Sequence, residues 1–359
     1  MLVLKKCLLV STNLIRDLCY TMSAPIKSQD IQPQILQSIL YGPARAKILN
    51  IALQLDLFSL IHHNQTTLDK LTKQLNLPLR SARFLLDALV GMGLLQKLKS
   101  QYKLGHEAAT FLVRGESRYI GAYLLGVSQF QDKWEQLSDC LKSGKPMAAA
   151  TTPEAQTFFF QELAKALFSV NYLSAVHLAK KLGLGKTIKV PRILDVACGA
   201  APWSIACTLA DPGCQVVAMD LPGVLQVAQE QVQKFRLGKQ FQFLGGDLKE
   251  FNFGVEAFDL VILGHICHGV GEAETRCLLK KAYDALKVGG KIIVAEFLVN
   301  DLRTAPEVNL LFAMNMLLAT EQGDVFSIKD FKRWLGMVGF KKTTSLNLLY
   351  PTQGVVATK

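Results

Sequence analysis

Three absences narrow what this chain of 359 residues can be. Its eight cysteines form no C-x-x-C pair, so their spacing fits neither a zinc ribbon nor a disulfide framework and favours free thiols in a reducing, cytoplasmic setting. No stretch reaches eighteen uninterrupted apolar residues, so the sequence predicts no transmembrane helix. Finally, no run of lysine or arginine exceeds two residues, although the formal net charge is +11. Residues 1–110 hold +7 of this charge, and a basic front end raises the possibility of nucleic-acid binding. The basic residues are dispersed within that segment, so they do not settle the question.

The first 30 residues are predicted to be a loose N-terminal extension. Their apolar start is faintly like a signal peptide, but Asn13, Arg16 and Asp17 interrupt it and no A-x-A-type cleavage site follows. Met22 is an alternative start, so the sequence leaves open whether residues 1–21 belong to the working protein.

Residues 31–115 are predicted to form a small, mainly helical domain. Helical periodicity and helix-start signals are found over three segments, 42–61, 66–77 and 78–95. Thr66 or Thr67 is expected to cap the second helix, and alternating apolar and polar residues over 95–105 predict a small hairpin. Three helices followed by a β-wing are typical of a winged-helix domain.

The third of these helices bears on the choice between DNA binding and dimerisation. Arg80 and Arg83 would lie on the helix that reads DNA in such a domain. Phe84, Leu85, Leu86 and Leu89 crowd the same helix, and an apolar surface is better explained by a dimer interface than by a DNA groove. We therefore expect a homodimer and no nucleic-acid partner.

Residues 116–185 are predicted as a helical connector, and residues 186–359 as an α/β domain. In the α/β domain, strand-like and helix-like segments alternate, and the strands are nearly continuously apolar, which indicates a parallel sheet covered on both faces. The strands are expected at 192–198, 214–220, 241–246, 258–264 and 291–299. Segments 341–349 and 354–359, joined by a turn with Pro351, are expected to add an antiparallel hairpin.

Acidic residues end three successive strands of this sheet. In a doubly wound sheet the ligand lies beyond the C-terminal ends of the strands. Asp195 ends the first strand, Asp220 the second and Asp247 the third. A carboxylate at Asp220 suits a ribose diol, and one at Asp247 can accept from an adenine amino group.

The loop after the first strand points to the kind of nucleotide ligand. Ala197, Gly199 and Ala201 are small residues at alternate positions, which let the backbone approach a ligand closely. The pattern G-x-G-x-x-G is absent, because the first glycine is missing and the loop turns to Pro202-Trp203. This counts against the pyrophosphate of NAD and favours a cofactor without phosphate.

Several motifs, in order, resemble one family. "ILDVACG", "MDLPGV", "GGDLKE", "ICH", "ALKVGGKIIVAEF" and "NMLLATEQGDVFSIKDFKRWLGMVGF" are similar to motifs of class I S-adenosylmethionine-dependent small-molecule O-methyltransferases, such as the caffeate, acetylserotonin and hydroxyneurosporene enzymes. The resemblance implies a Rossmann-like, doubly wound methyltransferase sheet, preceded by a winged-helix dimerisation domain. S-adenosylmethionine is then expected against Asp195, Ala197, Gly199, Asp220, Leu221, Asp247, Leu248 and Gly264.

The resemblance also assigns catalytic residues. His268, in "CHGV", matches the proposed general base of the family, although Gly269-Val270 replaces the Asp-Trp of the plant enzymes. Glu296 ends a neighbouring strand and is expected to reach the other ring nitrogen of His268. A second glutamate of the family is matched by Ile328, so that support is missing.

His265 and His268, with Cys267 between them, admit two other interpretations. A metal site needs more ligands, and a strand-to-loop segment does not bring residues three apart onto one face, so we predict no metal. Either histidine can also be a packed residue satisfied by hydrogen bonds, which is the interpretation we give to His265.

Apolar side chains are expected to wall the acceptor pocket. Phe159, Phe312 and Met316 suit a planar organic acceptor, and Asn315 stands as a polar group among methionines. The sequence thus predicts a cytoplasmic methyltransferase acting on a hydroxyl of a small aromatic or polyene-derived metabolite. C- or N-methylation on the same fold, or a winged-helix regulator that senses the cofactor or a metabolite, are the alternatives.

Overall fold

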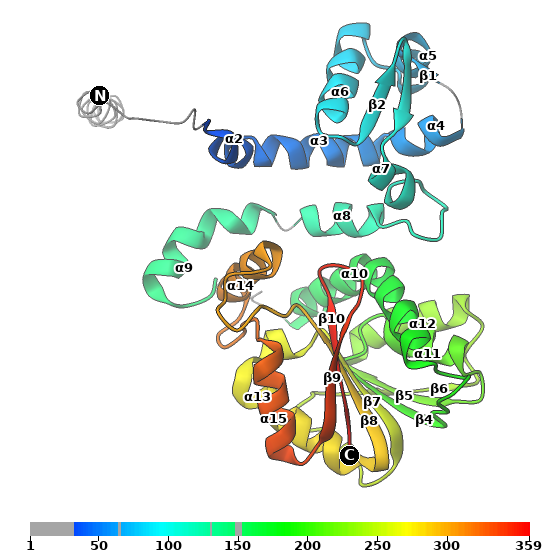
Figure 1. The fold of residues 1–359 in the computed structure, drawn as a ribbon, viewed down its shortest axis with the longest axis vertical. Coiled ribbons are helices and arrows are strands. Elements are labelled where there is room, and N and C mark those ends of the chain that lie inside the picture. The colour runs from blue at the N-terminus through cyan, green and yellow to red at the C-terminus, as the bar shows by residue number, and fades with distance from the viewer. Residues whose placement is uncertain (1–31, 64–65, 130, 148–152) are drawn as a thin grey trace. The chain divides into compact units, whose positions relative to one another are not determined.

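The computed structural model describes residues 32–63, 66–129, 131–147 and 153–359 (Figure 1). The chain divides into two compact units, one up to Lys47 and one from Ile48 onward. The predicted N-terminal extension and the alternative start at Met22 lie outside the described residues, and the predicted boundaries at 115/116 and 185/186 stay predictions. Among the described residues, no helix combines the length and apolarity needed to cross a membrane.

The N-terminal third is mainly helical, as expected. Its elements are α2 (Gln34–Leu40), α3 (Gly42–Gln54), α4 (Leu57–His63), β1 (Thr66–Thr67), α5 (Leu68–Leu75), α6 (Leu79–Gly91), β2 (Leu95–Leu98), β3 (Gln101–Leu104) and α7 (His106–Phe111). Thr67 caps α5 by accepting a hydrogen bond from the backbone N–H of Lys70. The expected hairpin is present as the antiparallel pair β2–β3, which β1 extends. Phe58, Leu71 and Leu86 are buried in the core of this region.

The prediction of one helix over residues 42–61 was wrong, because the segment forms two helices, α3 and α4. Asp56 adopts a left-handed backbone with φ 51°, which ends the helical path between them. An aspartate tolerates this conformation better than most residues. Its Oδ1 accepts a hydrogen bond from the Ser59 hydroxyl at 2.8 Å and so ties the turn to α4.

The predicted connector is helical and leads into a seven-stranded sheet. The connector elements are α8 (Gly121–Ser128), the 3-10 helix η1 (Gln131–Gln136), α9 (Leu137–Ser143) and α10 (Pro153–Leu182). The sheet consists of β4 (Arg192–Val196), β5 (Gln215–Asp220), β6 (Phe241–Gly245), β7 (Phe258–Gly264), β8 (Leu286–Glu296), β9 (Lys341–Asn347) and β10 (Gln353–Thr358). Its order is β6-β5-β4-β7-β8-β10-β9.

Five strands of this sheet pair in parallel, and the last two form an antiparallel pair in which only β10 runs against the rest of the sheet. β4 to β8 pair in parallel, while β10 lies between β8 and β9 and runs against both. This is the predicted doubly wound α/β fold with a C-terminal hairpin (Figure 1). The parallel strands bring their C-terminal ends to one edge, where the ligand of such a sheet is expected.

Helices cover both faces of the sheet and bury its alternating side chains. They are α10, α11 (Pro202–Ala210) and α12 (Pro222–Lys234) on one face, and α13 (Cys267–Ala285) and α15 (Ile328–Val338) on the other. The remaining helix, α14 (Glu307–Ala319), contacts α9 and η1. Ile193 belongs to a core cluster with residues of α10, α11 and α12, and its neighbour Leu194 to a cluster with residues of α13 and α15. Successive strand residues point to opposite faces, so this division is the expected result of two covered faces.

The start of α13 corrects a prediction. We expected a strand-to-loop segment around His268, but α13 begins at Cys267. His268 therefore lies in the first turn of a helix, and Gly271, with φ 80° and ψ 178°, interrupts the helical path after that turn. A Cβ at Gly271 would lie 2.4 Å from the carbonyl oxygen of Gln322, so a larger residue would not fit there.

Candidate active site

The loop after β4 has an unusual backbone. Ala197, Gly199 and Ala201 have φ values of 52°, 57° and 58°, so the three small residues expected to face a ligand are all left-handed. Non-glycine residues in this region cost energy and concentrate at functional sites. At Gly199 the conformation, not space, favours glycine, because an added Cβ would meet nothing closer than the Cβ of Ala164 at 3.9 Å.

Asp220, the last residue of β5, holds this loop in place. Its Oδ2 accepts from the backbone N–H of Gly199 and its Oδ1 from that of Leu221, each at 2.7 Å. Burial raises the pKa of Asp220, and the two N–H groups act in the opposite direction. The carboxylate thus stands between the first loop and the start of α12, at the edge where the ligand is expected.

Asp195 lies deeper than the sequence led us to expect. It is 1 % exposed, and one of its carboxylate oxygens, Oδ2, accepts a hydrogen bond from the Ser204 hydroxyl of α11. Its other oxygen, Oδ1, is buried without a hydrogen-bond partner among the described residues. Burial raises the pKa of Asp195 to about 7, and Asp220 adds to this rise. Asp195 is therefore tied to α11 beneath the loop, and one of its carboxylate oxygens is open to a further hydrogen bond.

The other predicted cofactor residues occupy the same edge in different ways. Asp247 is exposed, and its Oδ1 accepts from the backbone N–H of Lys249 at 2.8 Å in a local turn. Leu221 is 36 % exposed at the start of α12, and Leu248 packs against the core. Gly264 ends β7 under the indole of Trp203, whose Cδ1 would lie 2.5 Å from an added Cβ. Glycine is required there by close approach.

His268 and Glu296 form the pair that the sequence predicts. His268 Nδ1 lies 2.7 Å from Glu296 Oε2, and Oε1 of the same carboxylate accepts from the backbone N–H of His268 at 3.2 Å. Phe297 N–H also donates to Oε2, at 3.2 Å. Burial acts to raise the pKa of Glu296, but the hydrogen bonds and charge of His268 together with the neighbouring His265 outweigh it, so the pKa lies below its usual value. The buried glutamate is therefore an ionised acceptor facing Nδ1.

His265 belongs to the same cluster, which the sequence did not reveal. The side chains of His265, His268 and Glu296 each offer one ligand atom, all within 4.8 Å of one another. The argument that these residues cannot converge was therefore wrong, because His268 stands on a helical turn and Glu296 comes from the neighbouring strand. The absence of a metal stays a prediction, since the short contact between His268 and Glu296 is explained by a hydrogen bond.

Aromatic rings surround the base. Phe312, on α14, meets His268 edge-on with 4.9 Å between ring centroids, and Phe297 lies 4.5 Å from Phe312. Phe312 is thus the predicted acceptor residue that the structure brings to the base. Sequence reasoning missed Phe297, although it directly follows Glu296.

The remaining predicted acceptor residues lie on α14 and α10. Met316 is buried one turn beyond Phe312 on α14, and Asn315 is half-buried beside it. Phe159 is half-buried on α10, where the Lys133 ammonium lies 4.2 Å from its ring centroid. The role of these three side chains in binding stays a prediction.

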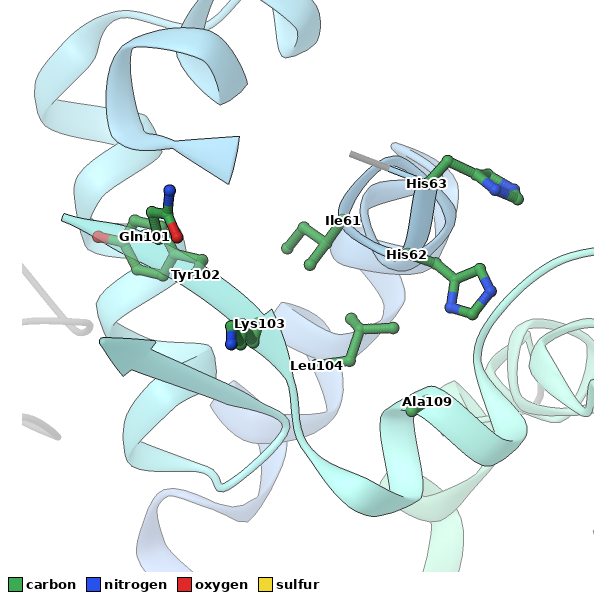
Figure 2. A pocket seen from close by; sticks show the side chains of 8 residues that line it. All are labelled: Ile61, His62, His63, Gln101, Tyr102, Lys103, Leu104 and Ala109. Carbon is green, nitrogen blue, oxygen red and sulfur yellow. The ribbon is translucent and has the colours of Figure 1, made fainter. Parts of the chain in front are cut away.

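A separate hollow of about 290 Å³ lies in the N-terminal third (Figure 2). Side chains of α4, β3 and α7 line it, including His62, His63 and Tyr102. It shares no residue with the edge of the seven-stranded sheet.

Comparison with known proteins gives matches over most of the chain. Residues 136–341 match a family described as the O-methyltransferase domain, and residues 38–114 match one described as the O-methyltransferase dimerisation domain. The tetracenomycin polyketide synthesis 8-O-methyl transferase TcmO of Streptomyces glaucescens is 29 % identical over 315 residues, which cover 84 % of this chain and 90 % of that protein.

Solved structures share the fold. A putative O-methyltransferase from Nostoc punctiforme superposes with a TM-score of 0.81 at 24 % identity, covering 92 % of this chain and all of the other. Human N-acetylserotonin methyltransferase, solved in complex with SAM, gives a TM-score of 0.75 at 22 % identity, covering 93 % and 99 %. At these identities the likeness concerns the fold alone.

Proposed function

This chain belongs to the O-methyltransferase family, and on that premise we propose the acceptor that it methylates and the residues that carry the reaction. It is a methyltransferase that depends on S-adenosylmethionine and acts on small metabolites. In our proposal the methyl group goes to a hydroxyl of an aromatic or polyene-derived metabolite, and His268 is the general base. The observation that carries the proposal is the 2.7 Å contact between His268 Nδ1 and Glu296 Oε2 at the ligand edge of the sheet.

The residues at this edge fit the cofactor. S-adenosylmethionine, when bound, supplies a methyl group on a positively charged sulfur. Asp220 would accept from its ribose hydroxyls, and the left-handed loop at Gly199 would lie against it. The carboxyl group of Asp195, with its Oδ1 open beneath the same loop, would add a second acidic side chain near the positively charged sulfur of the cofactor.

His268 would remove the proton of the acceptor hydroxyl. Its Nδ1–H donates to the Glu296 carboxylate, so Nε2 keeps its lone pair for the incoming proton. Glu296, which is ionised and buried, stabilises the imidazolium that forms. The oxygen that has lost its proton would then supply the electron pair of the new bond to carbon, while the electron pair of the broken carbon–sulfur bond would stay on the sulfur, which becomes a neutral thioether. The rings of Phe312 and Phe297 beside this base favour a flat acceptor.

A metabolite screen and one variant test the proposal. The full chain is incubated with labelled S-adenosylmethionine and candidate phenols or polyene alcohols, and mass spectrometry locates the methyl group in the product. With an acceptor in hand, His268→Ala should lower kcat by about 10²–10⁴-fold, the usual contribution of a general base. His177→Ala, at an exposed histidine of α10, is the matched control and should leave kcat unchanged.

Three results would count against it. A fall in kcat of less than tenfold for His268→Ala leaves positioning alone as the source of catalysis. A product methylated on nitrogen or carbon replaces the hydroxyl acceptor by the alternative chemistry. Sequence-selective, salt-dependent DNA binding without turnover favours the regulator.

We also propose that the working protein is a homodimer assembled through its N-terminal domain, in the cytoplasm. Residues 38–114 match a dimerisation domain, and α2 exposes Ile35, Leu36, Ile39 and Leu40 by 68–77 %. A row of apolar side chains of this kind is typical of an interface. Light scattering should give about twice the chain mass of 39.6 kDa, and Leu36→Asp with Leu40→Asp should shift it toward the monomer.

A further inference from the structure

His265 is the one histidine of the cluster to which the proposed mechanism gives no role. It directly follows β7 with a left-handed backbone, φ 59°, and its N–H donates to the carbonyl of Ala295 at 2.8 Å. Its side chain is 6 % exposed. The ring packs 4.4 Å from that of Phe297 and 6.1 Å from that of Trp203, measured between centroids. A polar ring is thus fixed in an apolar setting beside the base.

The two ring nitrogens of His265 face different groups. Nε2 lies 3.3 Å from the hydroxyl oxygen of Thr352, in the turn before β10. Nδ1 lies 3.8 Å from Glu296 Oε2 and has no hydrogen-bond partner among the described residues. A buried nitrogen without a partner costs free energy, so its position needs a reason.

The neighbouring charge and the Thr352 hydroxyl together favour one tautomer. A carboxylate attracts an N–H and repels a bare lone pair, and the attraction is strong in a buried setting. The favoured arrangement therefore places the proton of His265 on Nδ1, facing Glu296. Nε2 then carries the lone pair and accepts from the Thr352 hydroxyl.

From this geometry we propose that His265 is a positioning residue for the base. At 3.8 Å its Nδ1–H faces Oε2 of Glu296, the same carboxylate oxygen that His268 contacts, and the Thr352 hydroxyl, by donating to Nε2, stabilises the tautomer that makes this possible. The C-terminal hairpin thereby takes part in the active site through its turn. The inference rests on the proposed role of His268, because His265 acts on the reaction only through Glu296.

Loss of the His265 Nδ1–H should move the acid limb of the kcat–pH profile to higher pH. Removing the Nδ1–H leaves the carboxylate with more negative charge to share with His268, which favours the protonated ring. A higher pH is then needed to free Nε2 for the acceptor proton. The titratable groups that face His265 are Glu296 and His268, whereas Trp203, Phe297 and Thr352, which also pack on it, carry no charge.

Three variants test the positioning role of His265. Thr352→Val removes the hydroxyl with little change in shape, His265→Leu removes both ring nitrogens, and His265→Asn keeps an N–H donor close to the position of Nδ1. Asparagine also tolerates the left-handed backbone at this position, whereas leucine does not. Since His265→Leu can fail to fold, Thr352→Val carries the test on its own.

The measurement is kcat against pH with saturating cofactor and acceptor. We expect the acid limb of Thr352→Val and His265→Leu to move to higher pH by about one unit, an effect of about tenfold on that limb. His265→Asn should return the limb to within threefold of the unsubstituted protein, and KM for S-adenosylmethionine should not change. The inference is overturned if the acid limb of Thr352→Val stays at the pH of the unsubstituted protein, or if kcat falls by the same factor at every pH.

Failure of this inference can be told from failure of the proposed function. If His268→Ala keeps its activity, His268 is not the general base, and His265 has no base to position. If His268→Ala loses activity while Thr352→Val keeps the original pH profile, the base stands and only the role of His265 falls.

Discussion

Replacing His265 by asparagine should make the protein relatively more stable in acid. Burial lowers the pKa of His265 from an ordinary 6.5 to about 4 in the folded chain. Between these two values the unfolded chain binds a proton that the folded chain does not, so this histidine makes stability fall as the pH falls from 6.5 to 4. At pH 5 the cost is about 2 kcal/mol, because each pH unit below 6.5 contributes about 1.4 kcal/mol. At pH 8 it is zero.

The measurement is a difference between two proteins at two pH values. Asparagine does not titrate, so on going from pH 8 to pH 5 the free energy of unfolding of His265→Asn should rise by about 2 kcal/mol relative to the unsubstituted chain. Any constant loss, such as that of the ring contact with Phe297, cancels in this comparison. Urea unfolding followed by tryptophan fluorescence suits the assay, because Trp203 and Trp334 are buried.

A comparison is needed because Asp195 acts in the opposite direction. Its pKa is raised from 3.8 to about 7 by burial, so the folded chain keeps a proton that the unfolded chain loses. Stability therefore falls by about 4 kcal/mol as the pH rises through that window, which masks much of the histidine effect in the unsubstituted protein. His177→Asn, at an exposed site of α10, is the matched control for the exchange of histidine for asparagine. A pH-independent difference for His265→Asn would refute the reasoning, and so would one of opposite sign.

Four further outcomes follow from the structure. Glu296→Gln should lower kcat by about 10²–10⁴-fold without changing cofactor affinity in calorimetry, because it removes the charge that stabilises the base. Asp220→Ala should weaken cofactor binding about 10–100-fold by calorimetry, since charged hydrogen bonds contribute about 1.5–3 kcal/mol. Gly264→Ala should cost about 1–3 kcal/mol in urea unfolding, because its methyl group would overlap the Trp203 indole. Leu279→Ala should cost about 2–5 kcal/mol in the same assay, because Leu279 is fully buried.

The elements of the sheet were predictable because their cause is local. The strands around Ile193, Val216 and Ile262 are apolar on both faces, and the helices between them repeat their apolar residues with the helical period. Each short segment therefore indicates by itself whether it forms a strand or a helix. The failures have a local cause too. Asp56 and Gly271 interrupt helices by backbone conformation, which apolar periodicity does not register.

The site divides in the same way. The sequence by itself determined the small-residue loop at Gly199, the carboxylate at Asp220 and the pairing of His268 with Glu296, since each lies at or just beyond the C-terminal end of a strand and parallel strands end together. Only the tertiary structure decided that Asp195 lies beneath the loop and that α13 begins before His268. It alone joined His265 to Glu296 and to Thr352, which is 87 residues away in the chain. Such contacts depend on how β7, β8 and the turn before β10 pack side by side, and no short segment of the chain encodes that arrangement.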